Sequence, residues 1–191
     1  TENMYSQDKC IKQLVDDYGH EFISPDNLAG FKCDVALDCC ASLVDLVKPR
    51  LGFVELTQTG CKILSERNLD VPTVSIDSCR LKKVETFLGT GEAFIRGIKH
   101  LVNDDLIGKK VTLFGCGKVG SGILVNIANI PMIDITVVDG CMDNVKKLQD
   151  IGVHAININN KEEWIPGAVE SDYIVTATGI KHMLSSYLDA G

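Results

Sequence analysis

A glycine-rich segment is the part of the sequence whose residue types and spacing best suit ligand binding. Gly115, Gly117 and Gly120 have the spacing of a dinucleotide-binding turn, and the apolar run before them is typical of a buried strand. The first glycine permits a tight strand-to-helix turn, the second lets the backbone approach a ligand, and the third lets the helix pack on the sheet. The N-terminus of that helix would point its free N–H groups at an anionic group.

An acidic residue follows at the distance that this chemistry needs. Asp139 ends a second Val- and Ile-rich run, about 20 residues after the last of these glycines, where a carboxylate accepts hydrogen bonds from ribose hydroxyls. Strand, turn, helix, strand and acid in this order predict an adenosine-bearing cofactor; the alternative is a glycine-rich turn without a ligand. The predicted cofactor-binding residues are Gly115, Cys116, Gly117, Lys118, Val119, Gly120, Asp139, Gly140 and Thr176.

The composition is that of an ordinary folded protein. The 191 residues are 45% hydrophobic, with a net charge of −7 and a pI near 5.0. There is no run of Lys or Arg, no apolar stretch long enough to cross a bilayer, and no apolar leader in the polar first residues. We therefore expect a cytoplasmic protein that binds neither nucleic acid nor membranes.

The sequence contains eight cysteines, most of them within apolar or strand-like segments. This pattern is typical of buried thiols in a reducing compartment rather than of disulfides. No CxxC pair occurs, so no metal site is predicted. Cys39 and Cys40 are adjacent, and on a strand their side chains would point to opposite faces. One of them could then face a cleft while the other is in the core; the alternative is that both are small buried residues.

The apolar periodicity predicts an α/β fold in two parts. The first part is a small β-α-β-α-β unit, with strands at 33–38, 51–56 and 71–76 and helices at 41–47 and 59–68. A helix follows over 85–102, and its apolar stripe indicates packing against a core.

The second part alternates strands and helices from residue 109 onward. Right-handed crossovers then imply a Rossmann-like parallel sheet with helices on both faces. Trp164 is expected to anchor a polar loop before Pro166. The predicted parts are 1–84 as an N-terminal substrate-side unit, 85–108 as a linking helix, and 109–191 as the cofactor-binding domain.

The order of motifs from about Asp34 onward resembles that of S-adenosylhomocysteine hydrolase. The matching segments are LDCC at 37–40, ELTQTG at 55–60, VP at 71–72, DS at 77–78, GIK at 97–99, GCGKVG at 115–120, Asp139, and VTATG at 175–179. In that family the glycine loop, the acid and the threonines equivalent to Thr57, Thr59 and Thr178 hold NAD. The resemblance therefore implies an adenosyl cofactor here.

The chain departs from the hydrolase at the positions that move protons. Where the hydrolase has acids and a lysine around the ribose, this sequence has Cys39, Leu56 and Leu81. An aliphatic side chain cannot act as an acid or a base. Lys82 lies one residue from the position of the hydrolase's lysine. A shift of the alignment by one residue would restore the lysine but not the acids. Glu55, at the end of an apolar run, either faces the crevice or caps a neighbouring helix. Hydrolase activity is therefore not expected.

A retained adenosine site without proton-transfer groups favours an S-adenosylmethionine-dependent methyltransferase. It would resemble the pyridinol C-methyltransferases that help to build the iron-guanylylpyridinol cofactor of methanogenic archaea. Methyl transfer from a sulfonium depends mainly on positioning. Thr178, Thr57 and Thr59 are then the predicted catalytic residues, whose hydroxyls would polarise a small pyridinol-type acceptor.

Two other functions remain open. One is an NAD-dependent oxidoreductase, because the glycine turn and Lys118 suit a pyrophosphate, and Asp139 would repel a 2′-phosphate and so select NAD over NADP. The other is a non-catalytic module that binds the cofactor and reports it to a partner. The resemblance also implies a homodimer.

Overall fold

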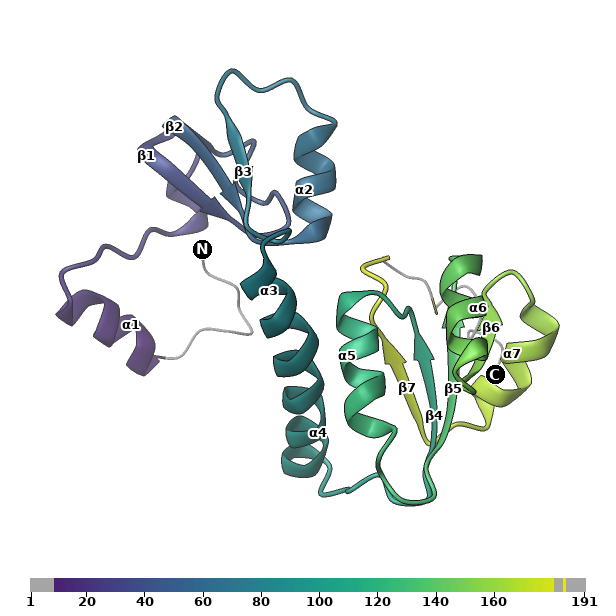
Figure 1. Ribbon diagram of the computed structural model, residues 1–191. Coiled ribbons are helices and arrows are strands. Elements are labelled where there is room, and N and C mark those ends of the chain that lie inside the picture. The colour runs from purple at the N-terminus through teal and green to yellow at the C-terminus, as the bar shows by residue number, and fades with distance from the viewer. Residues whose placement is uncertain (1–8, 181–183, 185–191) are drawn as a thin grey trace. The chain divides into compact units, whose positions relative to one another are not determined.

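The computed structural model describes residues 9–180 and Leu184, and divides the chain into two units. The first unit is Thr1–Cys79 and the second is Arg80–Gly191. Each unit contains its own parallel sheet (Figure 1). Among the residues described, no helix has both the length and the apolar character needed to cross a membrane.

The first unit is built on a three-stranded sheet in the order β1-β2-β3, with all strands parallel. Its elements are α1 (Lys9–Asp17), the 3-10 turn η1 (Pro25–Asn27), β1 (Phe31–Asp38), β2 (Val47–Glu55), α2 (Gln58–Ser65) and β3 (Thr73–Ser75). Alternation along β1 buries Ala36 and Asp38 and leaves Val35 and Leu37 exposed on the other face. The buried face meets Leu28 and Phe53 in a small core.

The predicted helix over 41–47 is wrong, because these residues form a loop that leads into β2 at Val47. Cys40 and Ala41 have positive φ angles of 62° and 53°, which a right-handed helix does not allow. Their amides donate to the carboxylate of Glu55, and the amide of Leu43 donates to that of Asp38. The positive φ angles and these hydrogen bonds to side chains give a turn where the apolar spacing indicated a helix.

The second unit has a four-stranded parallel sheet in the order β6-β5-β4-β7. Its elements are β4 (Lys110–Phe114), α5 (Lys118–Ile127), β5 (Asp134–Asp139), α6 (Met142–Asp150), β6 (His154–Asn157), α7 (Lys161–Val169) and β7 (Tyr173–Thr176). The sheet has a packed core on each face, and α5 and α6 contribute to one core while α7 contributes to the other. This confirms the predicted α/β class and the Rossmann-like parallel sheet with helices on both faces.

Consecutive residues of β4 illustrate the two cores. Leu113 packs in the core with α5 and α6, whereas Phe114 points the other way and meets Trp164 edge-on, with ring centroids 5.1 Å apart. Trp164 is fully buried in α7, and its indole N–H donates to the carbonyl of Ile158 at 2.9 Å. The expectation that Trp164 lies in a polar loop is therefore wrong, because it is part of α7.

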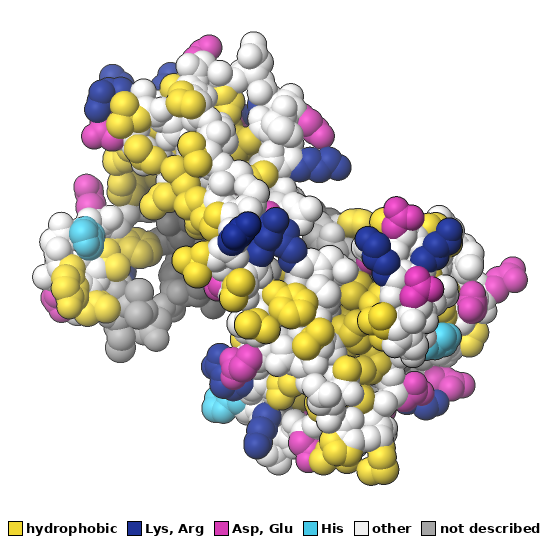
Figure 2. Space-filling view, in the orientation of Figure 1, with side chains coloured by type: hydrophobic (Ala, Val, Ile, Leu, Met, Phe, Trp, Pro, Cys, Tyr) yellow, Lys and Arg dark blue, Asp and Glu magenta, His cyan; other side chains and the backbone are white. Residues whose placement is uncertain are grey.

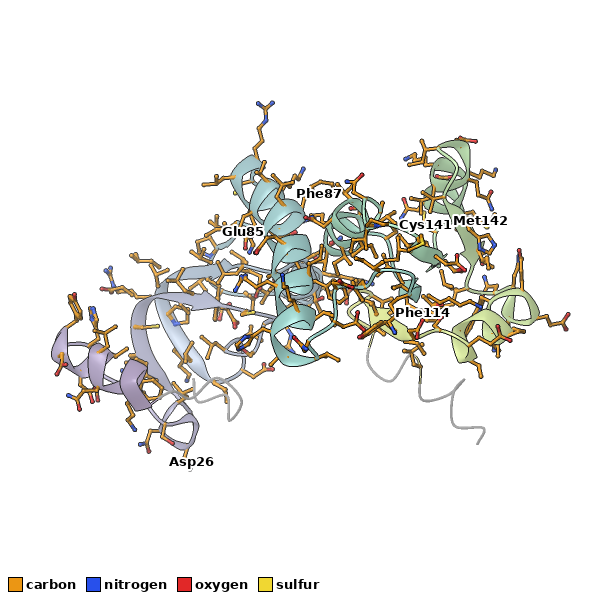
Figure 3. All side chains as sticks on the ribbon, turned by 90° about the horizontal axis from the view of Figure 1, so that it is seen from below. Asp26, Glu85, Phe87, Phe114, Cys141 and Met142 are labelled. Carbon is orange, nitrogen blue, oxygen red and sulfur yellow. The ribbon has the colours of Figure 1, made fainter. Side chains whose placement is uncertain are left out.

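A helical segment opens the second unit. It consists of α3 (Arg80–Val84), the π-helical turn η2 (Glu85–Gly89) and α4 (Thr90–Leu101). Figure 3 labels Glu85 and Phe87 in η2. The segment packs on α5 at close range, because a Cβ on Gly122 would meet the carbonyl of Phe87 and a Cβ on Gly91 would meet Gly122. Residues 85–101, which belong to the segment predicted as a linking helix over 85–108, thus pack within the second unit.

Apolar side chains reach the surface in both units, and acidic and basic side chains are interspersed on the face shown in Figure 2. More than half of the area of Leu37, Val74, Leu81 and Leu101 is exposed. The cysteines also differ from the prediction of buried thiols. In the described part of the chain, Cys33, Cys61 and Cys116 are half-buried and Cys39, Cys40, Cys79 and Cys141 are exposed. Both members of the adjacent pair are exposed because they follow β1 in a loop.

Candidate functional site

The glycine turn lies between β4 and α5, at the carboxyl edge of the second sheet. Gly115 has a φ of +86°, and a Cβ there would lie 2.9 Å from the side chain of Thr178 and 3.0 Å from the carbonyl oxygen of Ala177. A Cβ on Gly120 would meet the carbonyl oxygen of Gly115. Both glycines are therefore required by the protein's own packing.

Gly117 is different, because neither its backbone conformation nor a close contact requires glycine there. Its φ is an ordinary −74°, and apart from its chain neighbours no atom of the described residues lies within 4 Å of the place that a Cβ would take. The residue is the N-cap of α5 and provides no side-chain cap. The first N–H groups of a helix lack partners within the helix and favour anions. Gly117 thus leaves open space beside an anion-favouring helix end.

Asp139 ties the glycine turn to the neighbouring loop. It ends β5 and is 7% exposed. One of its carboxylate oxygens accepts from the amide of Cys116 at 2.6 Å, and the other accepts from the amide of Cys141 at 2.7 Å. The side-chain amide of Asn144 approaches at 3.5 Å. An ionised carboxylate offers about four acceptor positions, so Asp139 retains capacity for ribose hydroxyls while it holds the loops.

The thiol of Cys116 is not activated at this site. Burial, and after it the negative charge of Asp139, raise the pKa of Cys116 to about 11. The thiol is therefore protonated at neutral pH and unsuited to nucleophilic attack. Cys141 and Met142, which follow the same edge after β5, are both exposed (Figure 3).

The end of β7 brings two predicted threonines to the same edge. Thr176 is exposed, and Thr178 is half-buried against Gly115. The hydroxyl oxygen of Thr178 accepts from the amide of Ile180 at 3.1 Å, which leaves its proton for another acceptor. The second unit thus contains all the predicted cofactor-binding residues together with Thr178.

Thr57 and Thr59 belong to the first unit. Thr57 is the N-cap of α2, where its hydroxyl accepts from the amide of Gly60 at 3.0 Å and from the amide of Cys40 at 3.0 Å, and donates to Glu55 at 2.7 Å. Its one proton and both lone pairs are therefore engaged. Thr59 is exposed in the first turn of α2. Catalytic roles for these two residues remain predictions.

Two buried carboxylates organise the first unit, and sequence reasoning singles out only one of them. Asp38, the one it misses, is 1% exposed and accepts from the amides of Cys39 and Leu43 and from the hydroxyl of Ser42, at 2.7–3.1 Å. A signal for Asp38 is nevertheless present in the sequence, because an acid that ends an apolar strand run must find donors when it is buried.

Glu55 is fully buried and holds the loop that follows β1. It accepts from the amides of Cys40, Ala41 and Thr57 and from the Thr57 hydroxyl, at 2.7–3.1 Å. Burial alone would raise the pKa of the Glu55 carboxyl, but these hydrogen bonds outweigh it and lower that pKa. Glu55 is thus an ionised structural residue.

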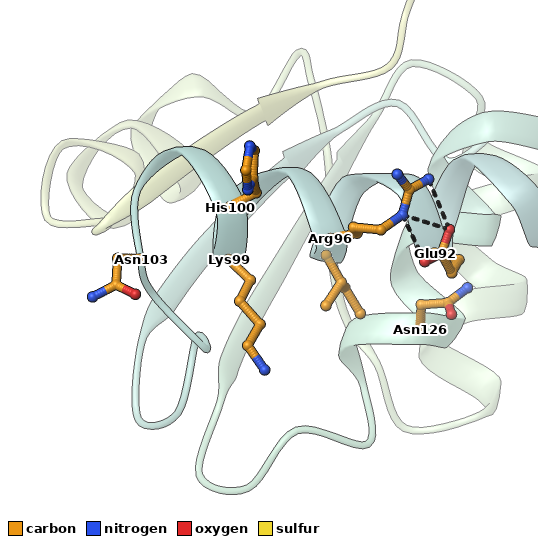
Figure 4. Close-up of a pocket in the computed structure, with 7 residues that line it drawn as sticks. Glu92, Arg96, Lys99, His100, Asn103 and Asn126 are labelled. Atoms are coloured by element: carbon orange, nitrogen blue, oxygen red, sulfur yellow. Dashed lines mark hydrogen bonds and ion pairs between the residues drawn. The ribbon is translucent and has the colours of Figure 1, made fainter.

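A hollow of about 550 Å³ lies along α4 and reaches Asn126 of α5 (Figure 4). It is lined by Glu92, Ile95, Arg96, Lys99, His100, Asn103 and Asn126. Arg96 and Glu92 form an exposed ion pair at 3.0 Å, of the kind that solvates a helix face. In residues 9–180, no three His, Cys, Asp or Glu side chains are placed to hold a metal ion.

No model of a known protein family matches the chain, and no curated protein sequence matches it. Among solved structures, it is similar to a dipicolinate synthase polypeptide from Bacillus halodurans, with 14% identity over 66% of this chain and 43% of that one and a TM-score of 0.49. The corresponding dipicolinate synthase polypeptide from Bacillus subtilis gives 12% identity, 76% and 49% coverage, and a TM-score of 0.48.

Shikimate 5-dehydrogenase from Listeria monocytogenes, in complex with shikimate and NAD, gives 19% identity over 92% of this chain and 55% of that one, with a TM-score of 0.42. The chain thus spans about half the length of these three structures. Likenesses of this size concern the arrangement of strands and helices and contain no information on ligand or activity.

Proposed function

We propose that the second unit binds an adenosine-containing cofactor at the carboxyl edge of its sheet, and that the protein is an enzyme that uses this cofactor. The observation behind the proposal is the open space at Gly117. The protein's own packing explains Gly115 and Gly120, whereas close approach of a ligand to the backbone would explain Gly117.

NAD is the first candidate. Helix α5 begins at Lys118, directly after Gly117, so its first amides lie where a diphosphate would sit. Asp139 would accept hydrogen bonds from the adenosine ribose and repel a 2′-phosphate, which favours NAD over NADP. Bound NAD would supply hydride transfer at its nicotinamide ring, and the protein would act as an oxidoreductase.

S-adenosylmethionine is the second candidate, favoured by what stands at the hydrolase's proton-transfer positions. Leu56 and Leu81 cannot transfer protons. A methyltransferase needs few acids or bases. Asp139 would then hold the ribose, the glycine turn would support the amino-acid portion, and Thr176 and Thr178 would face a small pyridinol-type acceptor.

The test is calorimetry on the full chain with NAD, NADP, S-adenosylmethionine and S-adenosylhomocysteine. We expect one of these ligands to bind the wild type. Gly117→Ala should weaken that binding at least about tenfold, which corresponds to 1.4 kcal/mol, because a methyl group would occupy the ligand's space. Tight NAD binding with no response to the sulfur ligands would exclude the methyltransferase.

Gly167→Ala is the matched control, because Gly167 lies on α7 and likewise has no described atom within 4 Å of the place that a Cβ would take. It should leave ligand binding unchanged. Equal affinities of the wild type and Gly117→Ala would contradict the proposed site.

A further inference from the structure

Asn157 is a buried polar residue at the end of β6, beside the proposed ribose site. It is 6% exposed and pairs in register with Asp139 of β5. Its side-chain nitrogen donates to the main-chain oxygen of Asp139 at 3.3 Å and approaches that of Gly140 at 3.5 Å. Its side-chain oxygen accepts from the amide of Asn159 at 3.0 Å. Asn157 therefore joins the loop after β5 to the loop after β6.

This arrangement fixes the backbone on which the Asp139 carboxylate depends. The turn through Gly140 presents the amide of Cys141 to that carboxylate at 2.7 Å. Removal of Asn157 would leave the main-chain oxygen of Asp139 with the amide of Ile158 as its donor, and that of the exposed Gly140 open to water. Without the link from Asn157 to the loop after β6, fewer contacts hold the turn in place.

We infer that Asn157 is a positioning residue that sets the selectivity of the ribose site for NAD over NADP. The inference rests on the proposed function. Asp139 can accept both ribose hydroxyls of NAD, and oppose a 2′-phosphate, when its backbone is held in one place. Asn157 provides that restraint without reaching the ligand's position at Gly117. A looser turn lowers the affinity for NAD and so narrows the preference for NAD over NADP.

The experiment compares the full-length wild type with Asn157→Ala by calorimetric titration of NAD and of NADP. The Kd for NAD should rise about five- to thirtyfold, which corresponds to about 1–2 kcal/mol, because the turn that presents Asp139 loses the hydrogen bonds of Asn157. The Kd for NADP should change little, because NADP does not use the carboxylate. The ratio of the two constants therefore falls by about the same factor.

Thr112→Val is the matched control. Thr112 is 1% exposed, lies in the same sheet, and shares a 2.7 Å hydrogen bond with Ser171 away from the site. This variant should be less stable than the wild type but should have the same ratio of the Kd for NADP to the Kd for NAD. If Asn157→Ala does not fold, Asn157→Ser keeps one donor and should lower the ratio in the same direction by a smaller factor.

The outcomes distinguish a failure of the role inferred for Asn157 from a failure of the proposed cofactor site. If Asn157→Ala weakens NAD and NADP equally, the residue is merely structural and the inference is overturned while the site stands. If the wild type binds S-adenosylmethionine but not NAD, the inference is again overturned and the proposed cofactor site stands. If the wild type binds none of these ligands, both are overturned.

Discussion

The two units use the same device, a buried carboxylate at the end of a strand, with different results. In the first unit, Glu55 accepts hydrogen bonds from the amides of Cys40, Ala41 and Thr57 and from the hydroxyl of Thr57. In the second unit, Asp139 accepts hydrogen bonds from one backbone amide in each of two loops. Among the residues described, one side-chain amide also approaches it, that of Asn144 at 3.5 Å. The donors of the first unit's own chain thus surround Glu55, whereas Asp139 keeps acceptor positions for a ligand.

The space beside a nearby glycine also differs between the two units. A Cβ on Gly60 would meet the carboxylate of Glu55, whereas a Cβ on Gly117 would meet no described atom within 4 Å. Gly60 therefore serves packing, whereas Gly117 leaves an opening. The surroundings of a glycine, rather than its presence in a motif, distinguish a closed turn from one that can admit a ligand.

The largest expected effect is that of Gly60→Ala. The added methyl group overlaps a buried, fully hydrogen-bonded carboxylate, so the first unit should lose about 4 kcal/mol of stability. Circular dichroism during urea unfolding measures this loss. Trp164 is the single tryptophan and is buried in the second unit, so its fluorescence follows that unit separately. For Gly117→Ala we expect a stability change within about 1 kcal/mol. If Gly60→Ala changed stability as little, the two glycines would not differ in their role in packing.

Glu55→Gln should have the next largest effect. The amide cannot accept every donor that faces the carboxylate, and hydrogen bonds to charged groups are worth about 1.5–3 kcal/mol, so we expect a loss of about 3 kcal/mol at pH 7. The folded-state pKa of Glu55 is lowered from its ordinary value of 4.5. Its contribution is thus present above pH 4.5 and is lost as the pH falls through the lower folded value.

Unfolding of the wild type and of Glu55→Gln by urea, repeated from pH 7 downward, checks this dependence. The difference between the two proteins should be constant above pH 4.5 and narrow below it. A difference that grows on acidification would show that the carboxyl is protonated in the folded protein.

The sequence predicted the second unit better than the first for a physical reason. Its strands and helices alternate with strong apolar periodicity, and the glycine spacing fixes where β4 ends and α5 begins. In the first unit, the loop over 39–46 has apolar residues at helical spacing, yet the Asp38 and Glu55 carboxylates take its amides. The bonds to Glu55 join residues 14 and 15 apart in the sequence and cannot be read from local periodicity.

The candidate site shows the same limit. The spacing identified Gly115, Gly117, Gly120 and Asp139, because a turn and its acid are close along the chain or at a typical distance. It did not show that Asp139 already holds two loop amides, or that the hydroxyl of Thr57 is fully engaged. These hydrogen bonds depend on which donors the folded chain brings near an acceptor.

Asp139→Asn tests whether the second unit's acid has two tasks. The amide nitrogen of the variant would face an N–H group, so one of the bonds to Cys116 and Cys141 is lost. We expect a loss of about 2 kcal/mol in the unfolding of the second unit, measured by Trp164 fluorescence. Affinity for the adenosine ligand should fall with it. A variant that keeps full ligand affinity would restrict Asp139 to the structural role that Glu55 has in the first unit.

Tyr173→Phe should have the smallest effect, because it acts at the opposite end of the second sheet. The hydroxyl of Tyr173 donates to Asp104 at 2.7 Å, and this hydrogen bond, with burial and the charges of Asp104 and Asp172, raises the pKa of Tyr173 to about 12. Its stabilising contribution is full below pH 10 and is lost as the pH rises through about 12. The variant should remove the last phenolate step from an alkaline absorbance titration and leave ligand affinity unchanged. Altered ligand affinity would mean that the open turn depends on the whole sheet, and the contrast between the two loops would then not be local.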